Sequence, residues 1–125
     1  MKPESSLELH DVTRIPKPWG YELIFAHTER YVGKVLHIDR GESLSLQYHE
    51  MKEETLFVIR GEVRLIARSG DREKELMMGV GDAFHIPPGL IHRMEAIEDT
   101  DIVEVSTPEL EDVVRLEDRY GRIPT

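Results

Sequence analysis

Hydrophobic and polar residues alternate in short runs over most of the chain, and turn-forming residues separate each run from the next. The pattern predicts strands at residues 21–27, 31–39, 43–48, 54–60, 62–67, 74–78, 83–86, 90–97 and 101–106. Glycine, proline and aspartate occupy the segments between them, and no run keeps the 3.6-residue period of a helix. Strands that recur about every ten residues are typical of a sandwich or barrel, so we expect an all-β fold.

The two ends of the chain depart from this pattern. The first dozen residues are polar and are predicted to form an arm, or a strand that pairs only in an oligomer. Residues 13–20 are rich in proline and glycine and are predicted to be a loop, whereas residues 108–122 are predicted to form a short helical turn. No repeat or linker interrupts the sequence, so we expect one domain over residues 1–125 with its barrel core at about 20–107.

The composition narrows the classes of partner and compartment. Asp and Glu number 25 against 16 Lys and Arg, a formal net charge of −9, which disfavours nucleic acid and anionic membranes as partners. The chain has no cysteine, so disulfides and thiolate chemistry are excluded. No apolar run reaches the ~20 residues of a membrane span, and the start of the chain has no signal-peptide core. We therefore expect a cytoplasmic protein.

Four polar side chains are predicted to meet inside the barrel. Strand alternation places Gln47 and His49 on one face, and Glu54 on the same face as the apolar residues that follow it. Such groups are costly to bury unless a divalent cation pairs them, and His92, after a Pro-Pro-Gly turn, can supply a fourth ligand. This set suits Zn²⁺, Fe²⁺, Mn²⁺, Co²⁺ or Ni²⁺. The alternative is that Gln47 and His49 are polar strand-end residues and Glu54 caps a turn.

The spacing of these residues favours the metal site. Gly41, Gln47, His49, Glu54 and Gly61 are spaced as in the first motif of the cupins, and Gly81, Pro87, Gly89 and His92 as in the second. The sequence therefore resembles the cupin superfamily, which implies a double-stranded β-helix, the cupin jelly-roll barrel. Gln47 stands where the family usually has histidine, and Ala96 where it often has asparagine.

A narrower resemblance covers most of the chain. Residues 17–22, 30–34, 41–49, 86–93, 102–108 and 112–122 resemble the C-terminal cupin domain of bacterial type II mannose-6-phosphate isomerases, which also has glutamine at the position of Gln47. The resemblance implies one divalent metal ion, with Zn²⁺ expected, held by Gln47, His49, Glu54 and His92. The nucleotidyltransferase domain that precedes this domain in those enzymes is absent from the sequence, so guanylyl transfer is not expected.

The implied activity is the interconversion of mannose 6-phosphate and fructose 6-phosphate through a metal-stabilised enediol. The loop at 50–56 departs from those isomerases, which carry histidines and an arginine there where this chain has Glu50, Met51, Lys52 and Glu53. Lysine cannot replace arginine as a two-pronged phosphate clamp. Two alternatives therefore stay open: another metal-cupin enzyme, such as a dioxygenase or a sugar lyase, and a non-catalytic cupin that binds a sugar or metabolite.

Several residues are candidates for the proton transfers of an isomerase. Glu50, Glu53 and His85 are base candidates near the mouth of the site, and Lys34 matches a family lysine that could face inward. A buried core histidine is an equal alternative for His85, and a solvated strand-edge charge is the alternative for Lys34.

Other charged residues are candidates for substrate contacts or for structural salt bridges. Lys52 and Arg93 could hold a phosphate, with ordinary surface charge as the favoured alternative. Arg115 and Arg119 in the tail are interpreted as partners in structural salt bridges. A homodimer is expected from the architecture and the family, because pairing would shield strand edges.

Overall fold

The computed structural model describes residues 7–123, which form eleven strands. The strands are β1 (Thr13–Lys17), β2 (Gly20–His27), β3 (Val32–Ile38), β4 (Leu46–Tyr48), β5 (Glu54–Arg60), β6 (Glu62–Ser69), β7 (Arg72–Gly79), β8 (Ala83–Ile86), β9 (Ile91–Ala96), β10 (Thr100–Ser106) and β11 (Val114–Glu117). No helix in this part of the chain is long and apolar enough to cross a membrane.

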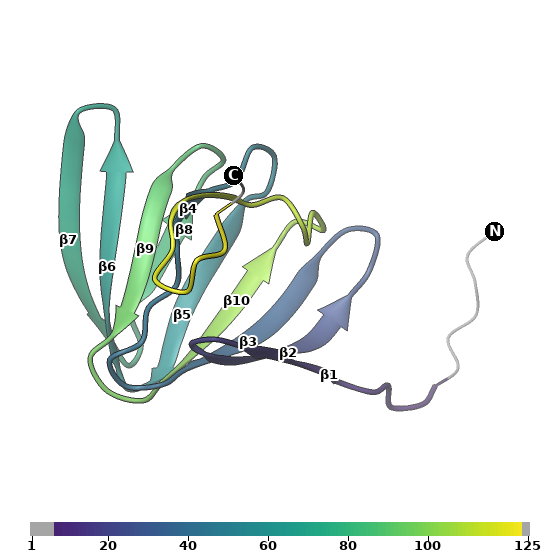
Figure 1. Cartoon of the computed structure of the whole chain (residues 1–125). Helices are drawn as coiled ribbons and strands as arrows, with labels where there is room; N and C mark the ends of the chain where they lie inside the picture. Colours follow the sequence, from purple (N-terminus) through teal and green to yellow (C-terminus); the bar gives the residue numbers. More distant parts are fainter. Residues whose placement is uncertain (1–6, 124–125) are drawn as a thin grey trace.

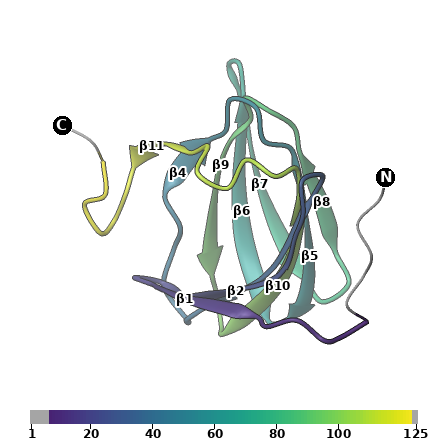
Figure 2. The same cartoon turned by 90° about the vertical axis from the view of Figure 1, so that its right-hand side faces the viewer.

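The strands form two facing sheets, a double-sheet jelly-roll barrel (Figure 1). The larger sheet has the order β1-β2-β3-β10-β5-β8 and the smaller sheet the order β11-β4-β9-β6-β7, with antiparallel pairing throughout. Viewed from the side, the sheets enclose a wedge, and the segment that leads to β11 runs across its upper end (Figure 2). The predicted all-β jelly-roll fold is therefore confirmed.

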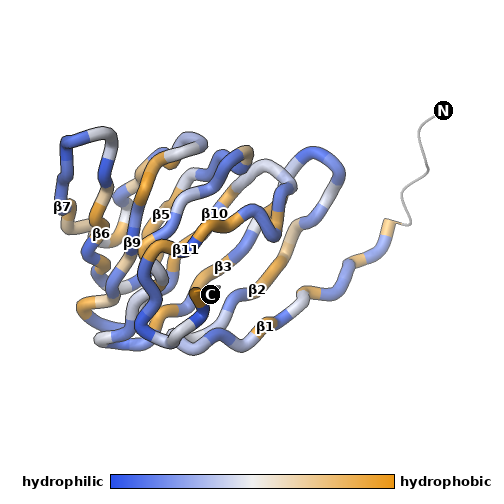
Figure 3. Tube along the Cα trace, turned by 45° about the horizontal axis from the view of Figure 1, so that its top comes forward, coloured by the Kyte–Doolittle hydropathy of each residue, from blue (hydrophilic) through white to orange (hydrophobic). Residues whose placement is uncertain are grey.

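The hydrophobic core lies between the sheets. Leu56 and Val58 of β5 face Val63 and Leu65 of β6, and all four side chains are fully buried. Burying each side chain contributes roughly 1.5–3 kcal/mol, so these alternating positions hold the two layers together. Figure 3 shows hydrophobic residues concentrated along the strands and hydrophilic residues at the hairpin tips.

The inward faces change from apolar to polar towards one end of the barrel. Along β5 the inward residues run from Val58 through Leu56 to Glu54, and along β10 they run from Ile102 to Glu104. Successive inward residues of a strand lie two positions apart, so the polar residues of both strands gather at the same end. This end of the interior is where the predicted site lies.

The step between β5 and β6 depends on a glycine. Gly61 adopts a φ of +86°, and an added Cβ would collide with the carbonyl oxygen of Asp99 and lie 2.8 Å from the Cα of Thr100. Only glycine combines this backbone conformation with so close an approach. The last glycine of the first motif therefore allows the chain to pass directly from one sheet to the other.

Three predicted segments differ from the structure. Residues 13–17, predicted as a loop, form the edge strand β1, where Pro16 is tolerated because an edge strand has one unpaired side. The tail forms β11 in place of a helical turn. Only residues 46–48 of the predicted strand 43–48 are a strand, with Ser43 in an isolated bridge to Glu95. Of the predicted arm, residues 1–6 lie outside the described residues and residues 7–12 belong to no strand.

Candidate metal centre

Three ligand-type side chains meet at the polar end of the barrel. His49 follows β4, Glu54 begins β5 and His92 lies in β9, and one ligand atom from each lies within 4.8 Å of the other two. Glu54 lies between the imidazoles, with 3.6 Å from its carboxylate oxygens to His49 Nε2 and to His92 Nε2. All three side chains are buried, so little water reaches them.

The imidazole hydrogen bonds define which nitrogen faces the cluster. His49 Nδ1 donates to the carbonyl oxygen of Asp112 at 2.5 Å, and His92 Nδ1 donates to that of Leu90 at 2.9 Å. In the neutral tautomer each Nε2 then carries a lone pair directed at Glu54, and neither atom has a hydrogen-bond partner among residues 7–123. Two imidazole lone pairs and a carboxylate fit a divalent cation, and the outer hydrogen bonds orient the ligands as in known metal sites.

Gln47 lies beside this cluster. It is the cross-strand partner of His92 in the pairing of β4 with β9, so both side chains point into the barrel. The Oε1 atom of Gln47 accepts a hydrogen bond from Ser45 Oγ at 2.6 Å. An amide oxygen has two lone pairs, so Gln47 can also serve as a fourth ligand.

A backbone hydrogen bond joins the two motifs. The N–H group of Gly89, in the Pro-Pro-Gly turn, donates to the carbonyl oxygen of His49 at 2.7 Å. Gly89 adopts a φ of +84°, a left-handed conformation that glycine accommodates without strain. The turn that precedes His92 is therefore fixed against the segment that carries His49.

Lys52 lies inside the barrel, beside the candidate ligands. Its Nζ is 2.8 Å from Glu54 Oε2 and 3.1 Å from Glu104 Oε2, and the side chain is buried. Burial by itself would lower the pKa of Lys52, but the charges of Glu104 and Glu54 outweigh it and raise the pKa above its ordinary value. This is a correction to the favoured interpretation of Lys52 as surface charge.

The pKa values of the two carboxylates that contact Lys52, Glu54 and Glu104, are shifted in opposite directions. Burial opposes ionisation of Glu54, but its contacts with His49, His92 and Lys52 hold the pKa well below the ordinary value. Burial and the charge of Glu54 raise the pKa of Glu104. Glu54 is therefore the carboxylate suited to a metal, and Glu104 the one suited to carry a proton.

The polar end of the barrel contains a small cavity of ≈ 100 Å³. Gln47, His49, Lys52 and Glu104 line it on the side of the cluster. Lys34 lines another part of the cavity, and its Nζ lies 3.4 Å from Glu22 Oε1. Glu22 and Lys34 thus form a second buried ion pair beside Lys52 and Glu104. Lys34 therefore faces inward and is not a solvated edge charge.

The structure does not bring four other sequence candidates to the cavity. His85 is exposed on β8, where its Nε2 lies 2.5 Å from Glu53 Oε2 on the outer surface. Glu50 is exposed and does not line the cavity. Arg93 lies on the face of β9 opposite His92 and is 3.4 Å from Glu117 Oε2. For these four residues, closeness to the ligands in sequence does not place the side chain in the cavity.

Sequence reasoning did not assign a cavity-facing role to Glu22, Glu104 or Arg115, although all three line the cavity. A signal for Glu104 was present, because strand alternation places it on the same face as the apolar Ile102. No comparable signal exists for Arg115, because the strand that carries it was predicted as a helical turn.

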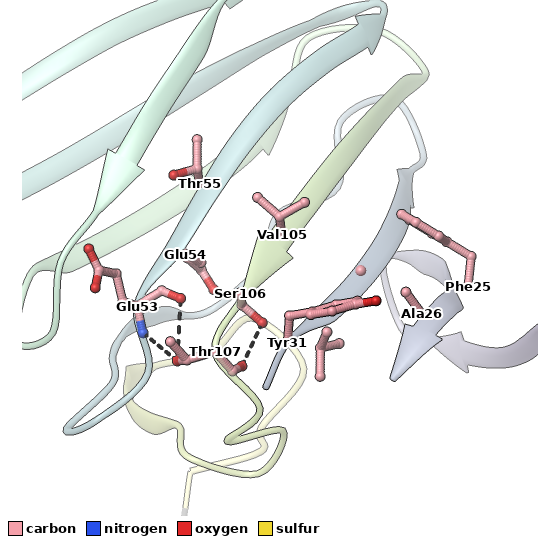
Figure 4. A pocket seen from close by; sticks show the side chains of 11 residues that line it. Phe25, Ala26, Tyr31, Glu53, Glu54, Thr55, Val105, Ser106 and Thr107 are labelled. Atoms are coloured by element: carbon pink, nitrogen blue, oxygen red, sulfur yellow. Dashed lines mark hydrogen bonds between the residues drawn. The ribbon is translucent and has the colours of Figure 1, made fainter. Parts of the chain in front are cut away.

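A larger hollow lies on the outer face of the six-stranded sheet (Figure 4). It measures ≈ 400 Å³, and its lining includes Phe25, Tyr31 and Val105. No histidine, lysine or arginine lines it. Its size exceeds that of the inner cavity, and its lining includes the carboxylates of Glu53 and Glu54. It offers no imidazole for a metal and no cation for a phosphate, so the inner cavity is the stronger candidate for the site.

A second group of ligand-type residues, His37, Asp39 and Asp99, lies at the surface. His37 is held by Asp101, 2.6 Å from its Nδ1, and Asp99 accepts a hydrogen bond from the N–H group of Arg40 at 2.9 Å. Both Asp39 and Asp99 are exposed, and water and neighbouring residues can satisfy such groups. The buried cluster is therefore the stronger candidate for a metal.

Comparisons with known proteins agree with the fold. The family model described as "Cupin domain" matches residues 34–107, which include all four candidate ligands. The chain is 35% identical to mannose-1-phosphate guanylyltransferase ManC of Salmonella typhimurium, covering 98% of this chain and 26% of that protein. It is 36% identical to mannose-1-phosphate guanylyltransferase of Escherichia coli, covering 91% of this chain and 24% of that protein. The chain thus spans about a quarter of the length of these curated relatives.

A solved structure shows the same fold. KdgF from Halomonas sp. superposes with a TM-score of 0.69 at 24% sequence identity, covering 82% of this chain and 92% of that one.

Proposed function

Because this chain belongs to the cupin domain family, we propose that it is a metal-dependent sugar-phosphate isomerase that interconverts mannose 6-phosphate and fructose 6-phosphate. One observation carries the proposal: the buried cluster of His49, Glu54 and His92 adjoins a cavity that also contains a carboxylate suited to proton transfer, Glu104. The curated relatives are named for mannose 1-phosphate, which supports a mannose phosphate as the class of ligand.

The proposed cofactor is one divalent metal ion held by His49, Glu54 and His92, with Gln47 as the fourth ligand. Zn²⁺ is the proposed metal because a set of two imidazole nitrogens and two oxygens suits it. Mn²⁺, Fe²⁺, Co²⁺ and Ni²⁺ are the alternatives. When bound, it would act as a Lewis acid towards the oxygens on C1 and C2 of the sugar.

The protein's own residues would move the protons. In the direction from aldose to ketose, Glu104 takes the proton from C2 and returns it to C1, while the hydroxyl proton of O2 passes to O1. A raised pKa makes Glu104 a stronger base than an ordinary carboxylate. Lys52, which contacts both Glu54 and Glu104, orients the two carboxylates relative to each other.

A coupled assay with purified, zinc-loaded protein and mannose 6-phosphate tests the proposal. Fructose 6-phosphate is expected as the product, with no turnover after the metal is removed by a chelator. Full metal occupancy without conversion of this or any related hexose phosphate would reject the isomerase.

Two variants test the assignment of the base. Glu104→Gln is expected to lower kcat by about 10²-fold or more while it retains metal, whereas His85→Asn on the outer surface is expected to retain activity. Metal content and thermal unfolding of both variants show that the comparison is made between folded, loaded proteins. Loss of activity in His85→Asn alone would instead favour the sequence-based candidate.

The size of the cavity favours a second candidate, a cupin that binds a small anionic metabolite without converting it. The cavity of ≈ 100 Å³ is smaller than the roughly 300–1,000 Å³ of usual small-molecule sites. A hexose phosphate therefore fits only if part of it stays outside or the covering tail moves outward. Calorimetric binding of mannose 6-phosphate with no product after long incubation would support this candidate over the isomerase.

A further inference from the structure

The C-terminal tail supplies one wall of the inner cavity. Strand β11 pairs with β4 at one edge of the smaller sheet (Figure 2). In this pairing Arg115 lies directly opposite Gln47. Arg115 and Gln47 both line the cavity. Because residues directly opposite in neighbouring strands share a face, the guanidinium of Arg115 lies on the same side of the sheet as the candidate ligands.

Arg115, Gln47 and His92 form a row across three neighbouring strands. Gln47 is the cross-strand partner of Arg115 in β11 and of His92 in β9. Neighbouring strands lie about 4.8 Å apart, so the backbones that carry Arg115 and His92 are separated by roughly 10 Å. A ligand with two functional ends can therefore reach both residues.

The lining of the cavity is rich in cations although the chain is acidic overall. Five lysine and arginine side chains and two glutamates line it, whereas the whole chain has a formal net charge of −9. A local excess of positive charge in a concave, partly buried site attracts anions from solution. The charge of the cavity is therefore opposite to that of the molecule.

Four of the five cations already have carboxylate partners. Lys17 and Lys34 lie 3.9 and 3.4 Å from Glu22. Lys52 is held by Glu54 and Glu104, and Arg122 forms two hydrogen bonds to Asp118, at 2.8 and 2.9 Å.

Arg115 is the exception. It has no hydrogen bond or ion pair among residues 7–123, and its Nε atom is shielded from solvent without a partner. Arg119, its neighbour in the tail, does form the predicted salt bridge, with Glu95 at 3.1 Å. For Arg115 the predicted salt bridge is absent from this part of the chain.

Asp118 is close enough for its charge to act on Arg115, but its carboxylate is already paired with Arg122. A partly desolvated guanidinium without a direct partner is energetically unfavourable. Burial and the nearby charge of Arg122 lower the pKa of Arg115 by more than the charge of Asp118 raises it, but a guanidinium still keeps its proton at neutral pH. An anion that enters the cavity would compensate this charge. The planar fork of arginine is suited to two parallel hydrogen bonds with a phosphate or a carboxylate.

We propose that Arg115 binds the phosphate group of the small molecule that enters this cavity, and that it thereby directs the other end of the molecule towards His49, Glu54 and His92. The identity of the sugar that carries the phosphate rests on the proposed function, whereas the binding of a phosphate by Arg115 does not. It makes the tail strand β11 part of the binding site and assigns the phosphate to Arg115 in place of the sequence candidate Arg93.

Calorimetry with zinc-loaded protein tests this assignment, with inorganic phosphate, mannose 6-phosphate and mannose as probes. Wild-type protein is expected to bind the two phosphates more tightly than mannose. Arg115→Gln is expected to weaken binding of mannose 6-phosphate by roughly tenfold or more, because a charge-assisted pair is lost. The affinity of Arg115→Lys for mannose 6-phosphate is expected to lie between those of the wild type and Arg115→Gln, because lysine keeps the charge but lacks the planar guanidinium.

Arg68→Gln is the matched control. Arg68 lies on β6 of the same sheet and pairs with Glu73 at 3.0 Å outside the cavity, so this variant is expected to bind as the wild type does. Zinc content should be the same in all variants, because Arg115 is not a proposed ligand. Wild-type affinity in Arg115→Gln, or failure of the wild type to bind either phosphate, would overturn the proposal.

A measurement on the wild-type protein covers the case in which a variant does not fold. The Nε–H resonance of Arg115 in nitrogen-15 NMR spectra is expected to shift as phosphate is added, and an unchanged resonance at saturation would overturn the proposal. These results are separable from the isomerase assay. Binding that depends on Arg115 without turnover rejects only the isomerase, and turnover with unchanged binding in Arg115→Gln rejects only the phosphate site.

Discussion

Asp112 and His49, 63 residues apart in the chain, are joined by a hydrogen bond of 2.5 Å from His49 Nδ1 to the carbonyl oxygen of Asp112. The carboxylate of the same aspartate accepts hydrogen bonds from three consecutive N–H groups, those of Glu50, Met51 and Lys52, at 3.0, 2.6 and 2.8 Å. These bonds lower the pKa of Asp112 below its ordinary value. One tail residue therefore both orients a candidate ligand and holds the loop that follows it.

Asp112→Ala is expected to weaken zinc binding. The variant keeps the carbonyl oxygen that holds His49 but loses the carboxylate that fixes the loop, and loss of such outer-shell contacts costs roughly 10–100-fold in metal affinity. Competition with a chromogenic chelator measures the effect. Glu111→Ala, an exposed neighbour, is the control, and equal zinc affinity in both variants would show that the carboxylate does not position the site.

Lys52→Met is expected to destabilise the metal-free protein more than the metal-loaded one. Without the ammonium group, Glu54 and Glu104 lose their shared cation, a loss of about 3 kcal/mol for a buried pair. Bound Zn²⁺ would compensate the charge of Glu54, so part of the lost free energy of unfolding should return.

Urea unfolding with and without zinc measures this difference, and Lys74→Met at an exposed position of β7 is the control. The same loss in both metal states would contradict a metal at Glu54.

Gly61→Ala is expected to lower the free energy of unfolding by about 2 kcal/mol or more. The new methyl group would collide with the backbone at Asp99 and Thr100, and φ would have to stay at +86°. Gly79→Ala is the comparison, because an added Cβ there meets nothing within 4 Å. Chemical denaturation measures both variants, and equal losses would show that the turn between β5 and β6 tolerates a side chain.

The tail should loosen only at strongly acidic pH. Hydrogen bonds from Arg122 lower the pKa of Asp118 to about 2, against roughly 3.9 in an unfolded chain. A depressed carboxyl pKa contributes stability that is complete above the unfolded pKa and is lost as the pH falls through the folded one. The loss should therefore occur between about pH 4 and pH 2.

The carboxyl carbon resonance of Asp118 reports this titration. Its midpoint is expected near the low value in the wild type and at a higher pH in Arg122→Gln, which loses the side-chain hydrogen bonds but keeps the backbone one. Identical midpoints would show that Arg122 does not hold the charge of Asp118.

The homodimer expected from the architecture stays a prediction, and the outer face of the larger sheet is where it can be tested. Phe25, Tyr31 and Val105 are partly exposed on this face (Figure 4). Phe57 of β5 is also partly exposed. Light scattering should give the mass of two chains for the wild type and of one for Val105→Glu, because a buried charge opposes pairing. A monomeric wild type would contradict the prediction.

Much of the fold follows from local patterns. The alternation along β5 and β10 is present in the sequence, because a strand with one buried face repeats every two residues. The motif spacing likewise locates His49, Glu54, His92 and the turn at Gly61. These features depend on neighbours in the chain, so they can be inferred without coordinates.

The sequence by itself therefore determined the class of fold and which residues could meet around a cation. Only the tertiary structure decided which charged residues share the interior with them. Lys52 lies in the loop between β4 and β5, where side chains do not alternate between two faces as they do in a strand. The neighbouring sequence therefore does not show that Lys52 points inward to Glu104. Arg115 faces the cavity because β11 pairs with β4, a contact between segments more than sixty residues apart. Such contacts depend on how the whole barrel closes, and no short stretch of sequence encodes that.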